Sequence, residues 1–215
     1  MHSKLTEFAF DYPHLIDFFD IGTSVNGLNL LAVRITNKHN VDPLKPKVRY
    51  IGNMHGDEAL SRQLLIKLII YLVEHYESDW NVYQILNTTE VYILPTMNPD
   101  GYANSDEGTC LPSSYKIAGP YTRHNANGID LNRDFPVLSR KPITRCQPET
   151  RAVIEWAKSV PFLLSANFHG GALLVSYPLD FLFYNGSSDC SDNDLVENIA
   201  KIYADNHRGG MARRL

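Results

Sequence analysis

Residues 48–58, VRYIGNMHGDE, join a short apolar run to two polar residues three positions apart. The run at 48–51 predicts a short buried strand, and apolar residues at helical spacing over 58–76 predict a helix directly after it. His55 and Glu58 therefore stand where the strand ends and the helix begins. Such a pair can direct both side chains at one ion, and imidazole nitrogen and carboxylate oxygen both suit zinc.

The rest of the chain alternates strands with helices. Two strands, 16–21 and 28–36, flank a hairpin turn at Asn26-Gly27. The later elements are a strand at 91–94, a helix at 149–159, a buried strand at 161–168 and a helix at 194–206. This order predicts an α/β fold, a mixed twisted β-sheet with helices on both faces. The intervening loop at 98–148 is long enough to indicate a functional region.

A third metal ligand is expected from the end of a neighbouring strand. Catalytic zinc takes three protein ligands plus water. His169 ends the strand predicted at 161–168 and is followed by two glycines. A lone histidine in such a place is more often structural, but all three residues are predicted at one sheet edge. The sequence thus predicts a metal site of His55, Glu58 and His169.

Four motifs carry a family resemblance: NMHGDE at 53–58, NPDGY at 98–102, NGIDLNRDFP at 127–136 and SANFHGG at 165–171. In this order they resemble the metallocarboxypeptidases, above all the regulatory branch that includes carboxypeptidases D, E, M and N. The resemblance runs from about residue 12 to about residue 211. It implies one Zn²⁺ ion on the three predicted ligands and hydrolysis of the C-terminal peptide bond by zinc-activated water.

The resemblance also implies roles for loop residues. Arg123 matches the arginine that steadies the oxyanion of the tetrahedral intermediate, although an ordinary loop arginine is the alternative. Asn132 and Arg133 match the pair that grips the substrate's terminal carboxylate. Asp130 and Asp134 flank this pair, and a structural role in orienting the loop is expected for both.

Asp180 matches the acidic residue that the regulatory branch associates with Lys and Arg preference. The expected partners are peptides or proteins ending in Lys or Arg, bound by a monomer. A solvated loop aspartate is the alternative reading. A cytosolic relative that trims acidic tails is a further possibility, but it would need a basic residue in this pocket, and Asp180 argues against it.

The family's general-base glutamate and closing tyrosine find no match. Glu197 is the glutamate that follows His169, and it does not fit the base motif. The later tyrosines do not fit either; they are Tyr177, Tyr184 and Tyr203. We therefore expect residues 1–215 to form a single partial catalytic domain without its last strands and helices and without the β-sandwich that follows in the regulatory branch. A non-catalytic zinc-dependent peptide-binding form or an inactive short isoform is the alternative.

Composition bears on partners and location. The formal net charge of -4 argues against nucleic acid, and no apolar run is long enough to span a bilayer. No signal-peptide pattern opens the chain, so a full-length chain would be cytoplasmic, whereas a fragment of a regulatory-branch enzyme would belong to the secretory pathway or cell surface. Sequons at Asn87 and Asn185 favour a glycoprotein. Three cysteines leave their pairing open; they are Cys110, Cys146 and Cys190.

Overall fold

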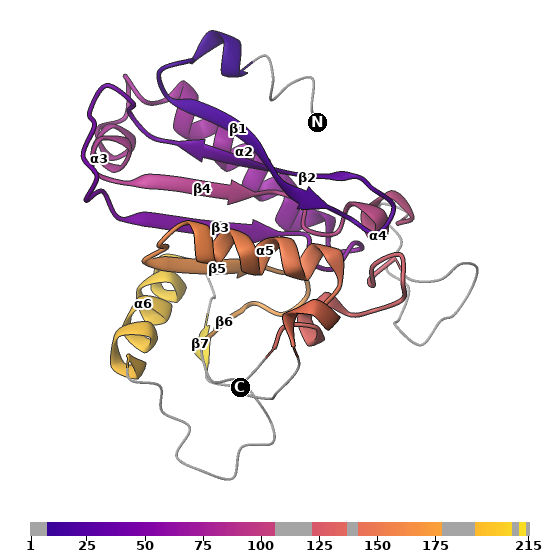
Figure 1. Cartoon of the computed structure of the whole chain (residues 1–215). Coiled ribbons are helices and arrows are strands. Elements are labelled where there is room, and N and C mark those ends of the chain that lie inside the picture. The colour runs from indigo at the N-terminus through magenta and orange to yellow at the C-terminus, as the bar shows by residue number, and fades with distance from the viewer. Residues whose placement is uncertain (1–7, 106–121, 137–141, 178–191, 208–210, 214–215) are drawn as a thin grey trace. The chain divides into compact units, whose positions relative to one another are not determined.

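The computed structural model describes residues 8–105, 122–136, 142–177, 192–207 and 211–213 (Figure 1). The chain divides into two compact units, residues 1–170 and 171–215, and each is considered by itself. The single partial domain predicted for residues 1–215 remains a prediction. Among the helices of these ranges, none has the length and apolar character needed to cross a membrane.

A five-stranded sheet forms the centre of the first unit, in the order β1-β2-β4-β3-β5. The strands are β1 (Ile16–Thr23), β2 (Asn29–Ile35), β3 (Lys47–Gly52), β4 (Glu90–Leu94) and β5 (Leu164–Phe168). The pairs β1–β2 and β2–β4 are antiparallel, whereas β3 runs parallel to both β4 and β5. The prediction of a mixed sheet is confirmed.

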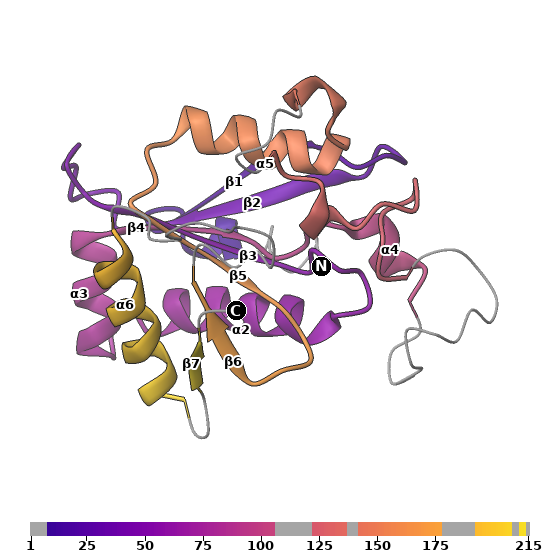
Figure 2. The ribbon, with the colours of Figure 1, turned by 90° about the horizontal axis from the view of Figure 1, so that it is seen from below.

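Helices cover both faces of this sheet, as predicted (Figure 2). They are α2 (Ala59–Glu74) and α3 (Trp80–Thr88) on one face and α5 (Pro148–Ser159) on the other, while the short α4 (Pro99–Ala103) follows β4 at the end of the sheet. The sheet has one hydrophobic core on each face. Alternate residues of β4 pack into one core or the other because successive strand side chains point to opposite faces. Val91 and Ile93 belong to the core that contains residues of α2 and α3, while Tyr92 and Leu94 belong to the core that contains Trp156 of α5.

The hairpin between β1 and β2 turns where its sequence predicts. Gly27 has φ 79°, a left-handed conformation that glycine adopts without steric cost. The turn is fastened to the start of α4, since Ser24 Oγ donates to Asp100 Oδ1 at 3.0 Å and the Asn26 amide donates to Asp100 Oδ2 at 3.1 Å. The hairpin therefore supports the N-terminal end of α4, which carries the NPDGY motif.

The structure corrects the prediction of a buried strand at residues 161–168. Strand β5 is largely exposed, with Leu164 36% and the preceding Leu163 70% accessible. Apolar composition predicts a strand but not its position in a sheet, and β5 is an edge strand among the described residues, paired with β3 on one side. Helix α3 was not predicted, although Asp79 gives a start signal by accepting hydrogen bonds from the amides of Asn81 and Val82.

The second unit contains β6 (Leu174–Ser176), α6 (Asn193–Asp205) and β7 (Met211–Arg213). Strands β6 and β7 are parallel, and α6 contacts both. The helix predicted at 194–206 is confirmed as α6. Glu197 forms an ion pair of 2.6 Å with Lys201, one turn further along the same helix. Asp180, Tyr184 and Cys190 lie outside the described residues, as does Cys110 in the first unit.

Candidate metal centre

The predicted ligands meet because β3 and β5 are parallel neighbours. Gly52 at the end of β3 pairs with Phe168 at the end of β5, so the segments that follow both strands emerge at one sheet edge. His55 and Glu58 come from the segment after β3, and His169 comes directly after β5. Ligands in α/β sheets bind at this edge, beyond the carboxyl ends of the strands.

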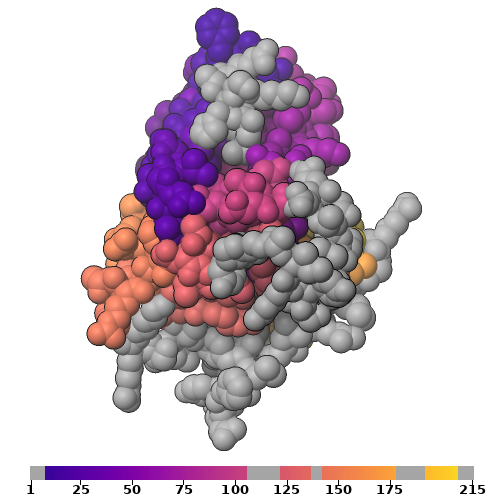
Figure 3. All heavy atoms as spheres, turned by 90° about the vertical axis from the view of Figure 1, so that its right-hand side faces the viewer, coloured from indigo at the N-terminus to yellow at the C-terminus, as the bar shows by residue number. Residues whose placement is uncertain are grey.

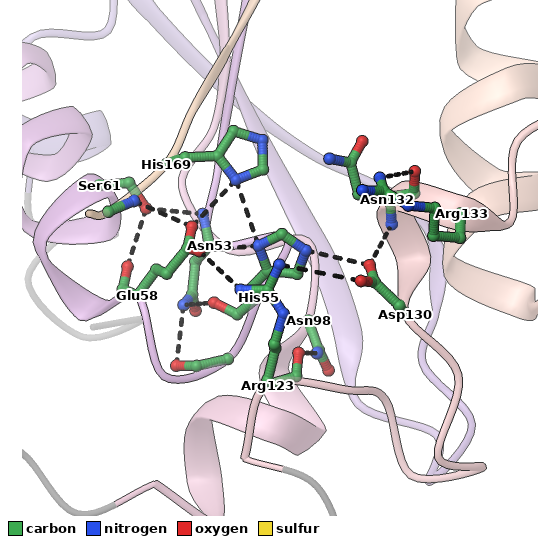
Figure 4. A network of polar contacts seen from close by, with 12 residues as sticks. Asn53, His55, Glu58, Ser61, Asn98, Arg123, Asp130, Asn132, Arg133 and His169 are labelled. Carbon is green, nitrogen blue, oxygen red and sulfur yellow. Dashed lines mark hydrogen bonds and ion pairs between the residues drawn. The ribbon is translucent and has the colours of Figure 1, made fainter. Parts of the chain in front are cut away.

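The three side chains offer a compact set of ligand atoms (Figure 4). One nitrogen or oxygen from each of His55, Glu58 and His169 lies within 4.8 Å of the others. His55 Nδ1 is 2.8 Å from Glu58 Oε1 and 3.2 Å from His169 Nδ1, which is itself 2.9 Å from Glu58 Oε2. His55 is buried, whereas the His169 side chain is 32% exposed. Two imidazole nitrogens and a carboxylate, open on one side, form a donor set that fits zinc.

Glu58 is held in its ionised form, which is the form that binds a metal. Burial raises its pKa, but the polar contacts with the rings of His169 and His55 and the hydrogen bond from the Gly170 amide, at 2.9 Å, outweigh burial. The net result is a pKa well below the ordinary value for glutamate. The glycine at 170 matters here because a Cβ would lie only 3.3 Å from Glu58 Cγ.

Asp130 orients the first histidine. Its Oδ1 is 3.0 Å from His55 Nε2 and also accepts from the Asn132 amide at 2.9 Å. Burial raises the pKa of Asp130, and the hydrogen bond to His55 leads the effects that lower it overall. A carboxylate on the far ring nitrogen leaves Nδ1 for a metal and fixes the ring. The sequence indicated only a loop-orienting role for Asp130, and the contact with His55 adds to it.

Arg123 lies beside the ligand set. Its Nη1 is 3.0 Å from Glu58 Oε1, and its Nη2 is 3.8 Å from Asp130 Oδ2. The backbone here passes close to two glycines. A Cβ at Gly56 would collide with the carbonyl of Thr122, and one at Gly101 would lie 2.6 Å from the carbonyl oxygen of His124. Both glycines are thus required for the placement of Arg123.

Asn132 and Arg133 occupy the short 3₁₀ helix η1 (Leu131–Arg133), which follows Asp130. Both are exposed, and Arg133 Nη1 donates to the Asn132 carbonyl at 3.0 Å. Asp134 is buried and accepts from the Gln147 amide at 2.7 Å, in keeping with its expected structural role. The segments near residue 100 and over 122–136 lie together on one face of the first unit, next to the hairpin (Figure 3).

Two further residues at this edge were not singled out from the sequence. Asn53 and Asn98 are fully buried and hydrogen-bond to the backbone around His55 and Arg123. Both could have been selected from the sequence, because each asparagine belongs to a quoted motif and follows a predicted buried strand. Buried asparagine is uncommon, and buried polar groups require partners.

Comparison with known proteins identifies the class. The family model of the M14 zinc carboxypeptidases matches residues 1–213. Carboxypeptidase D of Drosophila melanogaster is 43% identical over 208 residues, which cover 91% of this chain and 14% of that protein. The human carboxypeptidase N catalytic chain is 36% identical over 225 residues, covering 91% of this chain and 48% of its own length. The chain belongs to the zinc carboxypeptidase family, and it spans half or less of these relatives.

Solved structures agree on the fold. Thrombin activatable fibrinolysis inhibitor aligns with a TM-score of 0.75 at 17% identity, over 98% of this chain and 57% of that one. Carboxypeptidase A from Helicoverpa armigera aligns with a TM-score of 0.68 at 20% identity, over 94% of this chain and 51% of that one. The predicted α/β fold of the zinc carboxypeptidases is confirmed.

Proposed function

We propose that this chain forms catalytic machinery that hydrolyses the C-terminal peptide bond of peptides and releases Lys or Arg. The observation that carries the proposal is the meeting of His55, Glu58 and His169 beside the guanidinium of Arg123. These three residues would hold one Zn²⁺. When bound, zinc would polarise the scissile carbonyl and activate water for attack.

The remaining residues divide the work of binding and charge stabilisation. The Arg123 guanidinium would hold the negative charge that develops on the carbonyl oxygen. Asn132 and Arg133 would bind the terminal carboxylate of the peptide, which restricts cleavage to the last residue because internal bonds offer no carboxylate there. Asp180, which lies outside the described residues, would pair with the cationic side chain of that residue.

A second candidate is a non-catalytic zinc-dependent peptide-binding form. Within residues 1–215 the glutamate after His169 is Glu197, and its ion pair with Lys201 within α6 makes it a poor candidate for the general base that a carboxypeptidase of this kind needs. Loss of a general base lowers the rate by about 10²–10⁴-fold, while metal and carboxylate binding can persist.

The test uses matched peptides that differ only in a final Arg, Ala or Glu, incubated with the zinc-loaded protein and followed by mass. Loss of the final Arg alone is expected, and an Arg peptide with an amidated C-terminus should stay intact. Asp180→Asn should remove the preference for Arg over Ala while zinc content stays stoichiometric. No loss from any peptide, together with stoichiometric zinc, would favour the non-catalytic form.

The resemblance to the regulatory branch also leads us to propose the secretory pathway or cell surface as the location. The sequon at Asn87 gives little support to this location, because Asn87 is a poor site for a glycan. The side-chain amide of Asn87 donates to Tyr76 Oη at 3.1 Å and to the Tyr83 carbonyl at 2.8 Å, and a glycan on that nitrogen would replace one of the two N–H donors that these bonds use. Asn185, outside the described residues, is the better candidate acceptor.

A further inference from the structure

Two buried asparagines follow neighbouring strands at the metal-binding edge. Asn53 comes after β3 and Asn98 comes after β4, and both have no exposed surface. Their backbones run side by side, since the Met97 amide donates to the Gly52 carbonyl and the Asn98 amide to the Asn53 carbonyl, each at 3.0 Å. The two residues extend the pairing of the strands into the loops that carry the site.

The side chain of Asn53 closes the loop that bears the first two ligands. Its Nδ2 donates to the carbonyl of His55 at 2.9 Å and to that of Gly56 at 3.0 Å. Both partners are carbonyl oxygens, so the nitrogen of the amide must face them. The backbone amide of Asn53 meanwhile donates to Ser61 Oγ at 2.9 Å, and Ser61 Oγ donates to the Glu58 carbonyl at 2.9 Å. The asparagine thus fixes the path of residues 53–58.

This arrangement costs stability. Asn53 has φ 54°, the one left-handed non-glycine backbone among the described residues. Its Oδ1 is buried and has no hydrogen-bond partner within the described part of the chain. A left-handed backbone and an unpaired buried oxygen are both unfavourable, and such features gather at functional sites. Placement of the ligand loop accounts for an asparagine that the fold alone does not favour.

Asn98 acts on a different segment. Its Oδ1 accepts from the Gly101 amide at 2.9 Å and caps α4, while its Nδ2 donates to the carbonyl of Arg123 at 3.3 Å. The Gly56 amide donates to the same carbonyl at 3.2 Å. The backbone of Arg123 is therefore held from both neighbouring loops, and its guanidinium extends from this anchor to Glu58 (Figure 4).

We propose that Asn53 and Asn98 are positioning residues with separate targets. Asn53 places the metal ligands His55 and Glu58, and Asn98 places Arg123. The second assignment rests on the proposed function, because Arg123 acts in the hydrolysis proposed above. Loss of the Asn53 side chain should weaken zinc binding, whereas loss of the Asn98 side chain should slow turnover and leave zinc binding unchanged.

Asn53→Gly isolates the side-chain amide, since glycine adopts the left-handed backbone without strain. We expect zinc affinity, measured by competition with a chelator, to fall about 10-fold, the lower end of the range for residues that orient metal ligands. The absorption spectrum of the Co²⁺-substituted protein should change because the ligands move. Unchanged affinity and an unchanged spectrum would overturn the role of Asn53.

Asn98→Asp keeps the oxygen that caps α4 and replaces the nitrogen that donates to Arg123 with a second oxygen. Because Asn98 is fully buried, this variant also introduces a buried carboxyl group, for which the uncharged Asn98→Ala is the control. We expect kcat to fall about 10-fold or more, with KM and zinc affinity within about 2-fold, because a misplaced catalytic group affects the transition state most. Asn98→Ala should show the same loss of kcat and an added loss of thermal stability from the missing cap. An unchanged kcat, or zinc affinity that falls in step with kcat, would overturn the role of Asn98.

Asn87→Ala is the matched control. Its amide also donates to a backbone carbonyl, that of Tyr83, but within α3, at the other end of the sheet from the predicted ligands (Figure 1). This variant should lower thermal stability and leave zinc affinity unchanged. If Asn53→Gly behaved in the same way, Asn53 would be structural only.

Failure of the proposed function remains distinguishable from failure of this inference. If the unsubstituted protein binds zinc and hydrolyses nothing, the Asn53 assignment is still decided by zinc affinity. The Asn98 assignment is then decided by the ¹H–¹⁵N resonance of Arg123 Nε, which should shift in Asn98→Asp and stay in place in Asn87→Ala. An Arg123 resonance that did not move would overturn the assignment.

Discussion

The two ends of the sheet in the first unit are built in different ways. The site end comprises the segments after β3, β4 and β5, which carry the predicted metal ligands and Arg123 (Figure 1, right). The opposite end comprises residues 13–17, 36–47 and 75–90 around α3. At the site end, polar side chains are buried and bind backbone groups, as Asn53 and Asn98 do. The opposite end differs in its surface, where aromatic rings stack, although Thr36 and Lys45 are buried there too and donate to backbone carbonyls.

The rings of the opposite end form one continuous series. His39 stacks on His14 at 6.0 Å, His14 meets Tyr76 edge-on at 6.3 Å, Tyr76 stacks on Tyr83 at 5.5 Å, and Tyr83 on Trp80 at 5.7 Å. Stacked rings tolerate small shifts, whereas hydrogen bonds weaken steeply with angle. The site end therefore fixes atomic positions, and the opposite end contributes stability. Substitutions should separate these two properties.

Asp130→Asn should show the largest difference between an effect on zinc binding and an effect on stability. The amide keeps the size of the side chain but removes the charge that faces His55 Nε2 and Arg123. We expect zinc affinity to fall about 10–100-fold, the usual cost of losing the partner of a ligating histidine. The measurement is zinc competition at fixed pH, with thermal unfolding of the zinc-free protein as control. Equal zinc affinity would show that His55 is oriented without Asp130.

The sequence predicted the convergence of His55, Glu58 and His169 because it depends on local patterns, while their role as metal ligands remains a prediction. His55 and Glu58 lie between a strand and a helix that apolar periodicity reveals, and the adjacency of β3 and β5 then brings His169 to them. The family resemblance, rather than one of the four quoted motifs, pointed to Arg123, which the structure places beside Glu58. The roles of Asn132, Arg133 and Asp180 in substrate binding remain predictions.

Other features could not be predicted because they depend on long-range contacts. The exposure of β5 is set by its place in the strand order, and apolar composition alone does not specify that place. The bond between Asp130 and His55 joins residues 75 positions apart. For α3 a local signal existed in Asp79, but the helix has only nine residues, and a short apolar segment is difficult to assign from periodicity alone, so the helix was missed.

Asp17→Asn should have a smaller effect, confined to stability. Asp17 receives Arg34 Nη2 and Lys38 Nζ, each at 2.6 Å, at the opposite end. Burial raises the pKa of Asp17, but these hydrogen bonds lower it overall from 3.8. A lowered folded-state pKa gives stability that is present above the unfolded-state pKa and is lost as pH falls through the folded-state value.

We therefore expect Asp17→Asn to cost about 0.5–1 kcal/mol of unfolding free energy at pH 7, as for partly exposed ion pairs. The difference from the unsubstituted protein should shrink as pH falls below 3.8, the ordinary value for aspartate. Urea unfolding across this pH range measures it. Glu155→Gln is the control, because Glu155 pairs with Lys158 at a more exposed position and should cost almost nothing. A cost independent of pH would contradict the ion-pair explanation.

Trp80→Ala should have the smallest effect. Trp80 is 69% exposed, and its ring lies 5.7 Å from Tyr83 at an interplanar angle of 15°. One exposed stacked pair contributes about 0.5–1.5 kcal/mol at most, so we expect a loss at the lower end of that range and no change in zinc affinity. Trp156, only 5% exposed, is the contrasting tryptophan; Trp156→Ala should cost about 3–5 kcal/mol.

The protein has two tryptophans, so Trp80→Ala leaves Trp156 as the only one and its fluorescence reports unfolding of the core directly. A loss above about 2 kcal/mol, beyond what one exposed stacked pair can supply, would mean that the series of rings acts as a cooperative unit. A change in zinc affinity would contradict the comparison itself, because placement of the metal ligands would then depend on both ends of the sheet. We expect neither, since among the described residues the contacts that fix His55, Glu58 and Arg123 come from the site end alone.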